Sequence, residues 1–129
     1  MIDSSAAVEL LTNSELAVPV ATVAGDAELF APELLTLECV NALRGLERGR
    51  HLDPPEAAAA IDDLGLLPVR RIDTGPLTAA IWALRHNLTA YDASYVALAR
   101  SLGCPLVTLD QRLTRVRELG IDVVVPAQP

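Results

Sequence analysis

In "TAYDASYVALARSLGCPLVTLDQRL" (residues 89–113), an apolar helical pattern is followed directly by a short apolar run that is typical of a strand. A helix over 93–102 advances roughly 15 Å, and a strand over 105–109 returns roughly 16 Å. The chain therefore comes back to the level at which the helix began, and Asp92 and Asp110 should share one edge of a sheet. In parallel α/β proteins, helix N-termini and strand C-termini meet at that edge, and ligands bind there.

Outside this stretch, short apolar runs bounded by Gly or Pro alternate with helical patterns. Single helices between strands imply parallel pairing, with helices on both faces of the sheet. We therefore expect one α/β domain over residues 1–129 with a mostly parallel central sheet. Residues 13–27 carry no clear pattern, because Pro19 and Gly25 interrupt the helical spacing. The expected strands are 27–32, 66–72, 104–110 and 121–126, and the expected helices are 33–48, 54–65, 75–87, 92–102 and 111–119.

Composition limits the class of protein. The chain has 129 residues, of which 51% are hydrophobic, enough for one domain with a substantial core. No run approaches the roughly 20 apolar residues of a membrane span, and no basic leader precedes an apolar segment, so we expect a cytoplasmic protein. The net charge is −7 and all ten basic residues are arginine. This is the wrong sign for binding nucleic acid through bulk charge alone.

Cysteine and histidine are scarce. Cys39 and Cys104 lie far apart without a CxxC pair, which favours free buried thiols over a zinc or redox site. His51 and His86 sit in unrelated polar contexts, so catalysis built on histidine is not expected.

Four of the 17 acidic residues do not sit where a solvated face would place them. Asp3 follows the first apolar residues and leads into a helical pattern, so it belongs to the same sheet edge as Asp92 and Asp110. Glu38 falls on the margin of an apolar helix stripe, where a partly buried glutamate is costly unless a cation or hydrogen-bond donors satisfy it.

Each of these acids also has a simpler explanation when taken alone. The three aspartates fit helix N-caps, and Glu38 fits an edge residue that reaches solvent or pairs with Arg44 or Arg100. As a set, with no basic residue interleaved, they favour a functional site. Clustered carboxylates repel one another unless a metal ion neutralises them.

Four motifs of the chain strongly resemble the PIN domain, and in particular the VapC toxins of bacterial toxin–antitoxin pairs. They are "DSSAAVELL" (3–11), "APELLTLECVNALRG" (31–45), the stretch over 89–113 and "GIDVV" (120–124), and their order and spacing match over essentially the whole chain. The resemblance implies a PIN-like three-layer fold with a central sheet of four to five strands. It also implies a metal-dependent endoribonuclease that hydrolyses RNA phosphodiester bonds.

The resemblance assigns roles to individual residues. The four acids carry over as catalytic residues and as ligands of Mg²⁺ or Mn²⁺: Asp3, Glu38, Asp92 and Asp110. Supporting residues are the hydroxyls beside the first and fourth acids and an asparagine after the glutamate: Ser5, Thr108 and Asn41. Family members commonly form homodimers and are silenced by a cognate VapB-type antitoxin. One departure is that only Met1 and Ile2 precede Asp3, which makes the first strand very short.

The ligand type also predicts the metal. An all-carboxylate site suits a hard ion such as Mg²⁺ or Mn²⁺ and argues against zinc. Such an ion activates water and stabilises charge on a phosphate. Arg112, Arg115 and Arg117, just beyond Asp110, are candidates for contacting the RNA backbone, and a solvated helix face explains them about as well.

The sequence leaves two alternatives to the ribonuclease. One is a catalytically silent PIN-like module that binds an antitoxin and operator DNA. The other is a phosphatase with Asp3 as nucleophile, which the sequence disfavours because "DSS" lacks a second aspartate two residues on and the chain has no lysine to orient a phosphate.

Overall fold

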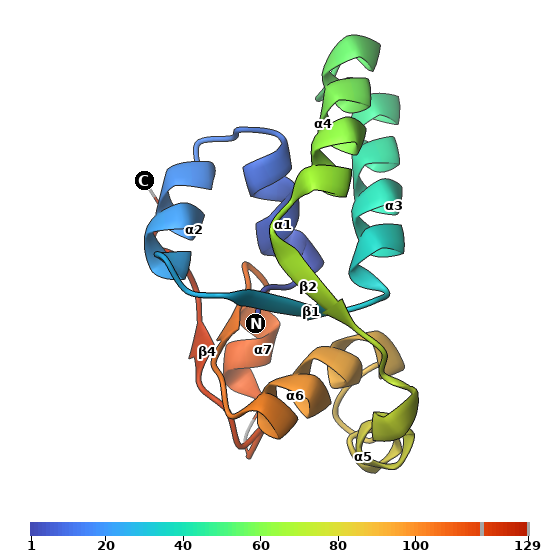
Figure 1. Ribbon diagram of the computed structural model, residues 1–129, viewed down its shortest axis with the longest axis vertical. Helices are drawn as coiled ribbons and strands as arrows, with labels where there is room; N and C mark the ends of the chain where they lie inside the picture. Colours follow the sequence, from blue (N-terminus) through green and yellow to red (C-terminus); the bar gives the residue numbers. More distant parts are fainter. Residues whose placement is uncertain (117, 129) are drawn as a thin grey trace.

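Short parallel strands form the sheet structure of the chain, and the computed structural model describes residues 1–116 and 118–128. β1 (Leu29–Pro32) pairs with β2 (Val69–Ile72), and β3 (Leu106–Val107) pairs with β4 (Val123–Val124), both in parallel (Figure 1). All four strands lie inside the predicted ranges. The α/β class and the parallel pairing are therefore confirmed.

The sheet is smaller than the predicted one of four to five strands, because the strands form two separate two-stranded sheets. Residues 1–3 connect them. Backbone hydrogen bonds make an isolated parallel bridge between Ile2 and Val107, and on its other side the Ile2 N–H donates to the Phe30 carbonyl (3.0 Å). In a parallel ladder the Ile2 carbonyl would accept the next hydrogen bond from the backbone nitrogen of residue 32. That residue is proline and has no N–H, so the ladder stops there.

The helices occupy most of the predicted positions, with three corrections. They are α1 (Ser4–Leu11), α2 (Ala17–Ala24), α3 (Leu35–Arg48), α4 (Pro54–Leu66), the 3₁₀ turn η1 (Gly75–Leu77), α5 (Thr78–Ala83), α6 (Ala90–Leu102) and α7 (Gln111–Arg115). α2 lies where no element was predicted, because Pro19 falls in the first turn of the helix, where a missing N–H is tolerated. The predicted helix over 75–87 is instead η1 followed by the short α5.

The third correction concerns the predicted helix over 111–119, which ends at Arg115. Glu118 has a positive φ of 64°, which a helix does not allow. Arg100 on α6 donates hydrogen bonds to the carbonyls of Glu118 and Leu119. These bonds hold Glu118 and Leu119 against α6.

Helices pack on both sides of the strands. Figure 1 shows α1, α3 and α4 on one side of β1 and β2, and α5 and α6 on the other. The fully buried side chains include Ile2 from the connecting segment and Leu35, Val96 and Leu106 from α3, α6 and β3. α6 is buried along Ala93–Ala99, which explains the continuous apolar run in its sequence. Within the described residues, no helix is long and apolar enough to cross a membrane.

Candidate functional site

Asp3 ends the connecting segment between the two sheets and begins α1. Its side chain is buried, with 8% of the residue exposed. Oδ1 accepts hydrogen bonds from the Ala6 N–H (3.1 Å) and the Ser5 hydroxyl (2.6 Å), and Oδ2 accepts one from the Thr108 hydroxyl. Burial raises the pKa of Asp3, and these hydrogen bonds oppose the rise. Asp3 is therefore the N-cap of α1, and hydroxyl groups also hold its carboxylate in place.

The Ser5 and Thr108 hydroxyls join Asp3 to the segment that carries Asp110. The Ser5 hydroxyl accepts from the Leu109 N–H (2.9 Å), and the Thr108 hydroxyl accepts from the Asp110 N–H (2.9 Å). The two hydroxyl oxygens lie 3.3 Å apart. Each hydroxyl thus links the Asp3 carboxylate to the backbone that follows β3. These links hold Asp3 and Asp110 on the same edge.

Glu38 lies on α3 and faces α1. Its Oε2 accepts a hydrogen bond from the Ser4 hydroxyl (2.7 Å), while its Oε1 is buried and has no hydrogen-bond partner within the described structure. Burial raises the pKa of Glu38, and the charges of Asp3 and Asp92 raise it further. The expected alternative of a partner in Arg100 is wrong, since that arginine binds carbonyls elsewhere.

The Tyr95 hydroxyl lies near the Glu38 carboxylate. Tyr95 is only 3% exposed, and its hydroxyl, like Oε1 of Glu38, has no partner that satisfies hydrogen-bond geometry in the described structure. Burial raises the pKa of Tyr95, with the charge of Glu38 as the next cause. Two neighbouring polar atoms are thus buried and unsatisfied, which is costly and needs an explanation.

Asp92 does not cap α6, so the capping explanation is wrong for this residue. The helix begins at Ala90, two residues before the predicted start, because the Thr89 hydroxyl accepts a hydrogen bond from the Asp92 N–H (3.2 Å) and serves as the N-cap. The Asp92 side chain is partly exposed in the first turn of the helix. Its carboxylate is free for another role.

Asp110 caps α7 and pairs with an arginine. Its Oδ1 accepts from the Arg112 N–H (2.9 Å), and the Arg112 guanidinium binds both carboxylate oxygens, with Nε at 2.9 and 3.0 Å. Hydrogen bonding to Arg112 lowers the pKa of Asp110. Asp92, Asp110 and Arg112 line one small hollow of about 190 Å³.

The four acids thus lie at one edge, but their side chains are not arranged around a common point. Within residues 1–116 and 118–128, no three His, Cys, Asp or Glu side chains are close enough to hold one metal ion. Ser4 engages one oxygen of Glu38, and Arg112 engages Asp110.

The remaining predicted residues lie on the outside of this edge. Asn41 is exposed on α3, one turn after Glu38. Arg115 is exposed on α7, and Arg117 lies outside the described residues.

Three residues near the acids were not singled out from the sequence: Ser4, Thr89 and Tyr95. Ser4 stands beside Ser5 in "DSS", but its contact with Glu38 spans 34 positions and depends on the packing of α1 against α3. The i, i+3 spacing from Asp92 to Tyr95 was a readable signal, since such residues share a helix face. Thr89 precedes the apolar run at the usual N-cap position.

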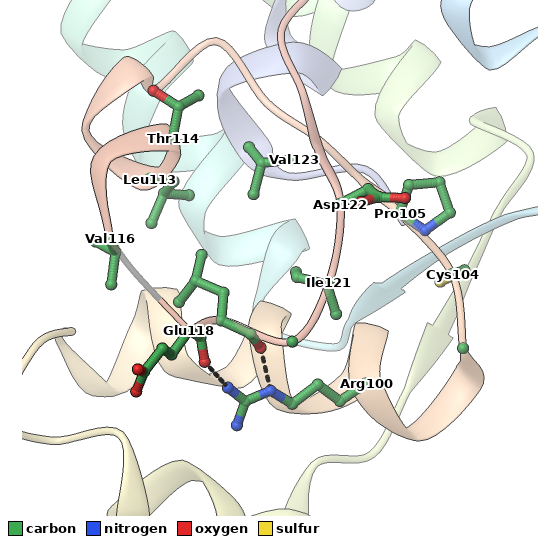
Figure 2. A pocket seen from close by; sticks show the side chains of 13 residues that line it. Arg100, Cys104, Pro105, Leu113, Thr114, Val116, Glu118, Ile121, Asp122 and Val123 are labelled. Carbon is green, nitrogen blue, oxygen red and sulfur yellow. Dashed lines mark hydrogen bonds between the residues drawn. The ribbon is translucent and has the colours of Figure 1, made fainter.

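A larger hollow lies away from the acids. It measures about 670 Å³ and lies between the end of α6, α7 and the segment before β4 (Figure 2). Figure 2 shows Arg100 along one wall, donating to the carbonyls of Glu118 and Leu119, with Leu113 and Val116 on the wall formed by α7. The arginine is thus occupied by backbone, and none of the four acids lines this hollow.

Comparison with known proteins identifies the same family as the sequence motifs. The PIN domain family model matches residues 1–119. The chain is 39% identical over 125 residues to VapC ribonuclease Mb0985 of Mycobacterium bovis, covering 97% of this chain and 96% of that protein. It is 34% identical over 115 residues to Ribonuclease VapC12 of Mycobacterium tuberculosis, covering 89% of each, and 42% identical over 94 residues to Ribonuclease VapC1 of the same species, covering 72% and 71%. The chain therefore belongs to the PIN domain family.

Proposed function

We propose that this chain is a single-domain, metal-dependent endoribonuclease of the VapC type, which hydrolyses RNA phosphodiester bonds with Mg²⁺ or Mn²⁺. Its ribonuclease relatives support the reaction class. The residues that would hold the ion are Asp3, Glu38, Asp92 and Asp110. The observation that carries the proposal is the buried, unpartnered Oε1 of Glu38 in the field of Asp3 and Asp92.

The chemistry of these residues fits a hard divalent ion. All the candidate ligand atoms are carboxylate oxygens, the donors that Mg²⁺ and Mn²⁺ prefer. A cation beside Glu38 would satisfy its free oxygen and offset the mutual repulsion of the acids. When bound, the ion would supply an activated water and stabilise negative charge on the phosphate.

The residues around the acids have separate tasks in this proposal. Ser5 and Thr108 keep the Asp3 carboxylate in one orientation, and Ser4 does the same for Glu38. Hydrogen bonds that orient the ligand side chains in this way preserve the affinity of a site for its ion. Arg112 and Arg115, exposed on α7 beside Asp110, would contact RNA phosphates. Local arginines are needed because the protein as a whole carries a net charge of −7.

Partner proteins form a further part of the proposal. Exposed apolar side chains occur on α3 and α4, with Leu37 74% and Leu66 81% exposed. A shallow apolar groove of about 300 Å³ lies between the same two helices. Such surface supports a homodimer, a VapB-type antitoxin, or both as partners. An RNA substrate would place the protein in the cytoplasm.

One observation favours a second function, a catalytically silent module that binds an antitoxin. The ion pair between Arg112 and Asp110 occupies one of the four acids, and the described side chains do not converge on one point. A module that no longer bound metal would have this arrangement.

Cleavage of RNA by the purified chain separates the two functions. A long single-stranded RNA should be cut with Mg²⁺ or Mn²⁺ and stay intact with EDTA. Asp92→Asn should abolish the cleavage, and Asp62→Asn on the exposed face of α4 makes the same chemical change as a matched control and should cut normally. Intact RNA with the wild-type chain under every metal condition would favour the silent module.

A further inference from the structure

Arg112 is the cation that the chain itself places on its candidate metal site. Its guanidinium Nε lies 2.9 Å from Oδ1 and 3.0 Å from Oδ2 of Asp110, and a terminal guanidinium nitrogen also donates to Oδ2. The backbone N–H of Arg112 donates to Oδ1 at 2.9 Å. Both oxygens of Asp110 therefore carry hydrogen bonds from a single residue.

A guanidinium and a divalent ion compete for the same atoms. The planar fork of arginine matches a carboxylate with two parallel hydrogen bonds. A metal ion bound to Asp110 needs at least one of those oxygens at roughly 2.1 Å. Asp92 lines the same small hollow, so two of the four proposed ligands share that hollow with Arg112.

The exposure of the pair allows an exchange. The Arg112 side chain is 81% exposed and that of Asp110 is 21% exposed. The guanidinium can swing into solvent without disturbing packing, and the Arg112 backbone N–H would still donate to the carboxylate and cap α7. The guanidinium is therefore not required for the helix to begin.

We infer that Arg112 is a built-in competitor of the metal: it occupies Asp110 in the metal-free protein and leaves when a divalent cation binds. This inference rests on the proposed function, because it assigns the regulation of the same site. Once released, the guanidinium stays on the rim of the site, where a substrate phosphate would attract it. Metal binding and exposure of a phosphate-binding group are then coupled.

The size of the effect follows from the kind of ion pair. Exposed pairs with good bidentate geometry contribute modestly, so removing the guanidinium should tighten Mn²⁺ binding by about two- to fivefold. Arg115 provides the matched control, because it is exposed on the same helix and carries the same charge. Its loss should change the affinity by less than about 1.5-fold, since salt screens exposed charges.

The test is the Mn²⁺ dissociation constant, measured from the electron paramagnetic resonance of free Mn²⁺, for the wild-type protein, Arg112→Gln and Arg115→Gln. Tighter binding by Arg112→Gln alone supports the inference. Equal affinities of all three proteins, or equal gains in both variants, would overturn it and leave the proposed function standing. Failure of the wild-type protein and of Arg112→Gln to bind Mn²⁺ at all would overturn the metal site and the inference together.

A second readout follows the guanidinium directly. In nuclear magnetic resonance spectra, the Arg112 Nε–H signal should lie away from that of Arg115 without metal and move toward it on titration with Mg²⁺. An Arg112 signal that stays in place while backbone signals at Asp110 respond to saturating Mg²⁺ would show that the ion pair survives metal binding, and would overturn the inference.

Discussion

Substitutions of Thr89 and Asp92, at the start of α6, should affect different properties: stability for Thr89 and metal binding for Asp92. The Thr89 hydroxyl accepts the Asp92 N–H as the N-cap, so Thr89→Ala should lower the free energy of unfolding by about 1 kcal/mol. For a chain of this length, that corresponds to a melting temperature lower by roughly 3–5 °C. Mn²⁺ affinity and RNA cleavage should stay within about twofold of wild type at temperatures where the variant is folded, because the Thr89 hydroxyl is engaged with a backbone N–H and carries no charge for a metal ion.

Asp92→Asn should show the opposite behaviour. A carboxylate in the first turn of a helix contributes about 0.3–1 kcal/mol through the helix dipole. Repulsion from Glu38 offsets part of this, since the charge of Asp92 adds to burial in raising the pKa of Glu38. The stability should therefore change by less than about 0.5 kcal/mol. Mn²⁺ affinity should fall at least about tenfold, since even the loss of a residue that only orients a ligand costs that much.

Urea denaturation and Mn²⁺ titration of both variants check the pair. A loss of more than about 1 kcal/mol in Asp92→Asn would mean that its carboxylate has a structural partner. Unchanged Mn²⁺ affinity in the same variant would remove Asp92 from the metal site.

Three further predictions concern pH, the buried tyrosine and assembly. Burial raises the pKa values of Asp3 and Glu38 above their usual 3.8 and 4.5, so the folded state binds protons more tightly than the unfolded state. The metal-free protein should therefore lose stability as pH rises through the raised values. In melting curves recorded between about pH 4 and pH 8, Asp3→Asn should make the melting temperature depend less on pH. Tyr95→Phe removes a buried hydroxyl without a partner, so denaturation should show unchanged stability or a gain of up to about 1 kcal/mol, and a clear loss would mean that the hydroxyl is hydrogen-bonded. Light scattering should show an assembly larger than a monomer for the wild-type chain at micromolar concentration. Leu37→Glu should shift it toward the monomer, because Leu37 is 74% exposed. A wild-type protein that is monomeric alone and does not assemble with its antitoxin would count against this prediction.

The helix and strand that lead to the site edge could be predicted from the sequence better than the extent of the sheet. A helix (Ala90–Leu102) and a short return strand (Leu106–Val107) lie at the predicted positions, because helical periodicity and the glycine that ends the helix act locally. Gly103 has a φ of 62°, as expected for a helix C-cap. The break in the sheet was not predicted, because it depends on Pro32 standing where the next hydrogen bond to the connecting segment would come from, and that register is set by tertiary packing.

The candidate site divides in the same way. The resemblance placed Ser5 with the first acid and Thr108 with the fourth, and in the structure both hydroxyls donate to Asp3 while Thr108 also accepts from the Asp110 N–H. The contact between Ser4 and Glu38 depends on how α1 packs on α3, and the Arg112–Asp110 pair depends on a side-chain rotamer at the start of α7. Neither is encoded in spacing along the chain.

The rate of RNA cleavage as a function of Mn²⁺ concentration, compared between the wild-type protein and Glu38→Gln, tests the central claim most directly. Glutamine keeps the size of the side chain and an oxygen that can accept from Ser4, but it removes the charge. We predict that wild-type cleavage rises with Mn²⁺ to a plateau and stops with EDTA, and that Glu38→Gln is folded and inactive at every Mn²⁺ concentration. Wild-type cleavage that persists in EDTA, or a Glu38→Gln variant that cuts as fast as wild type, would contradict a metal site built on these four acids.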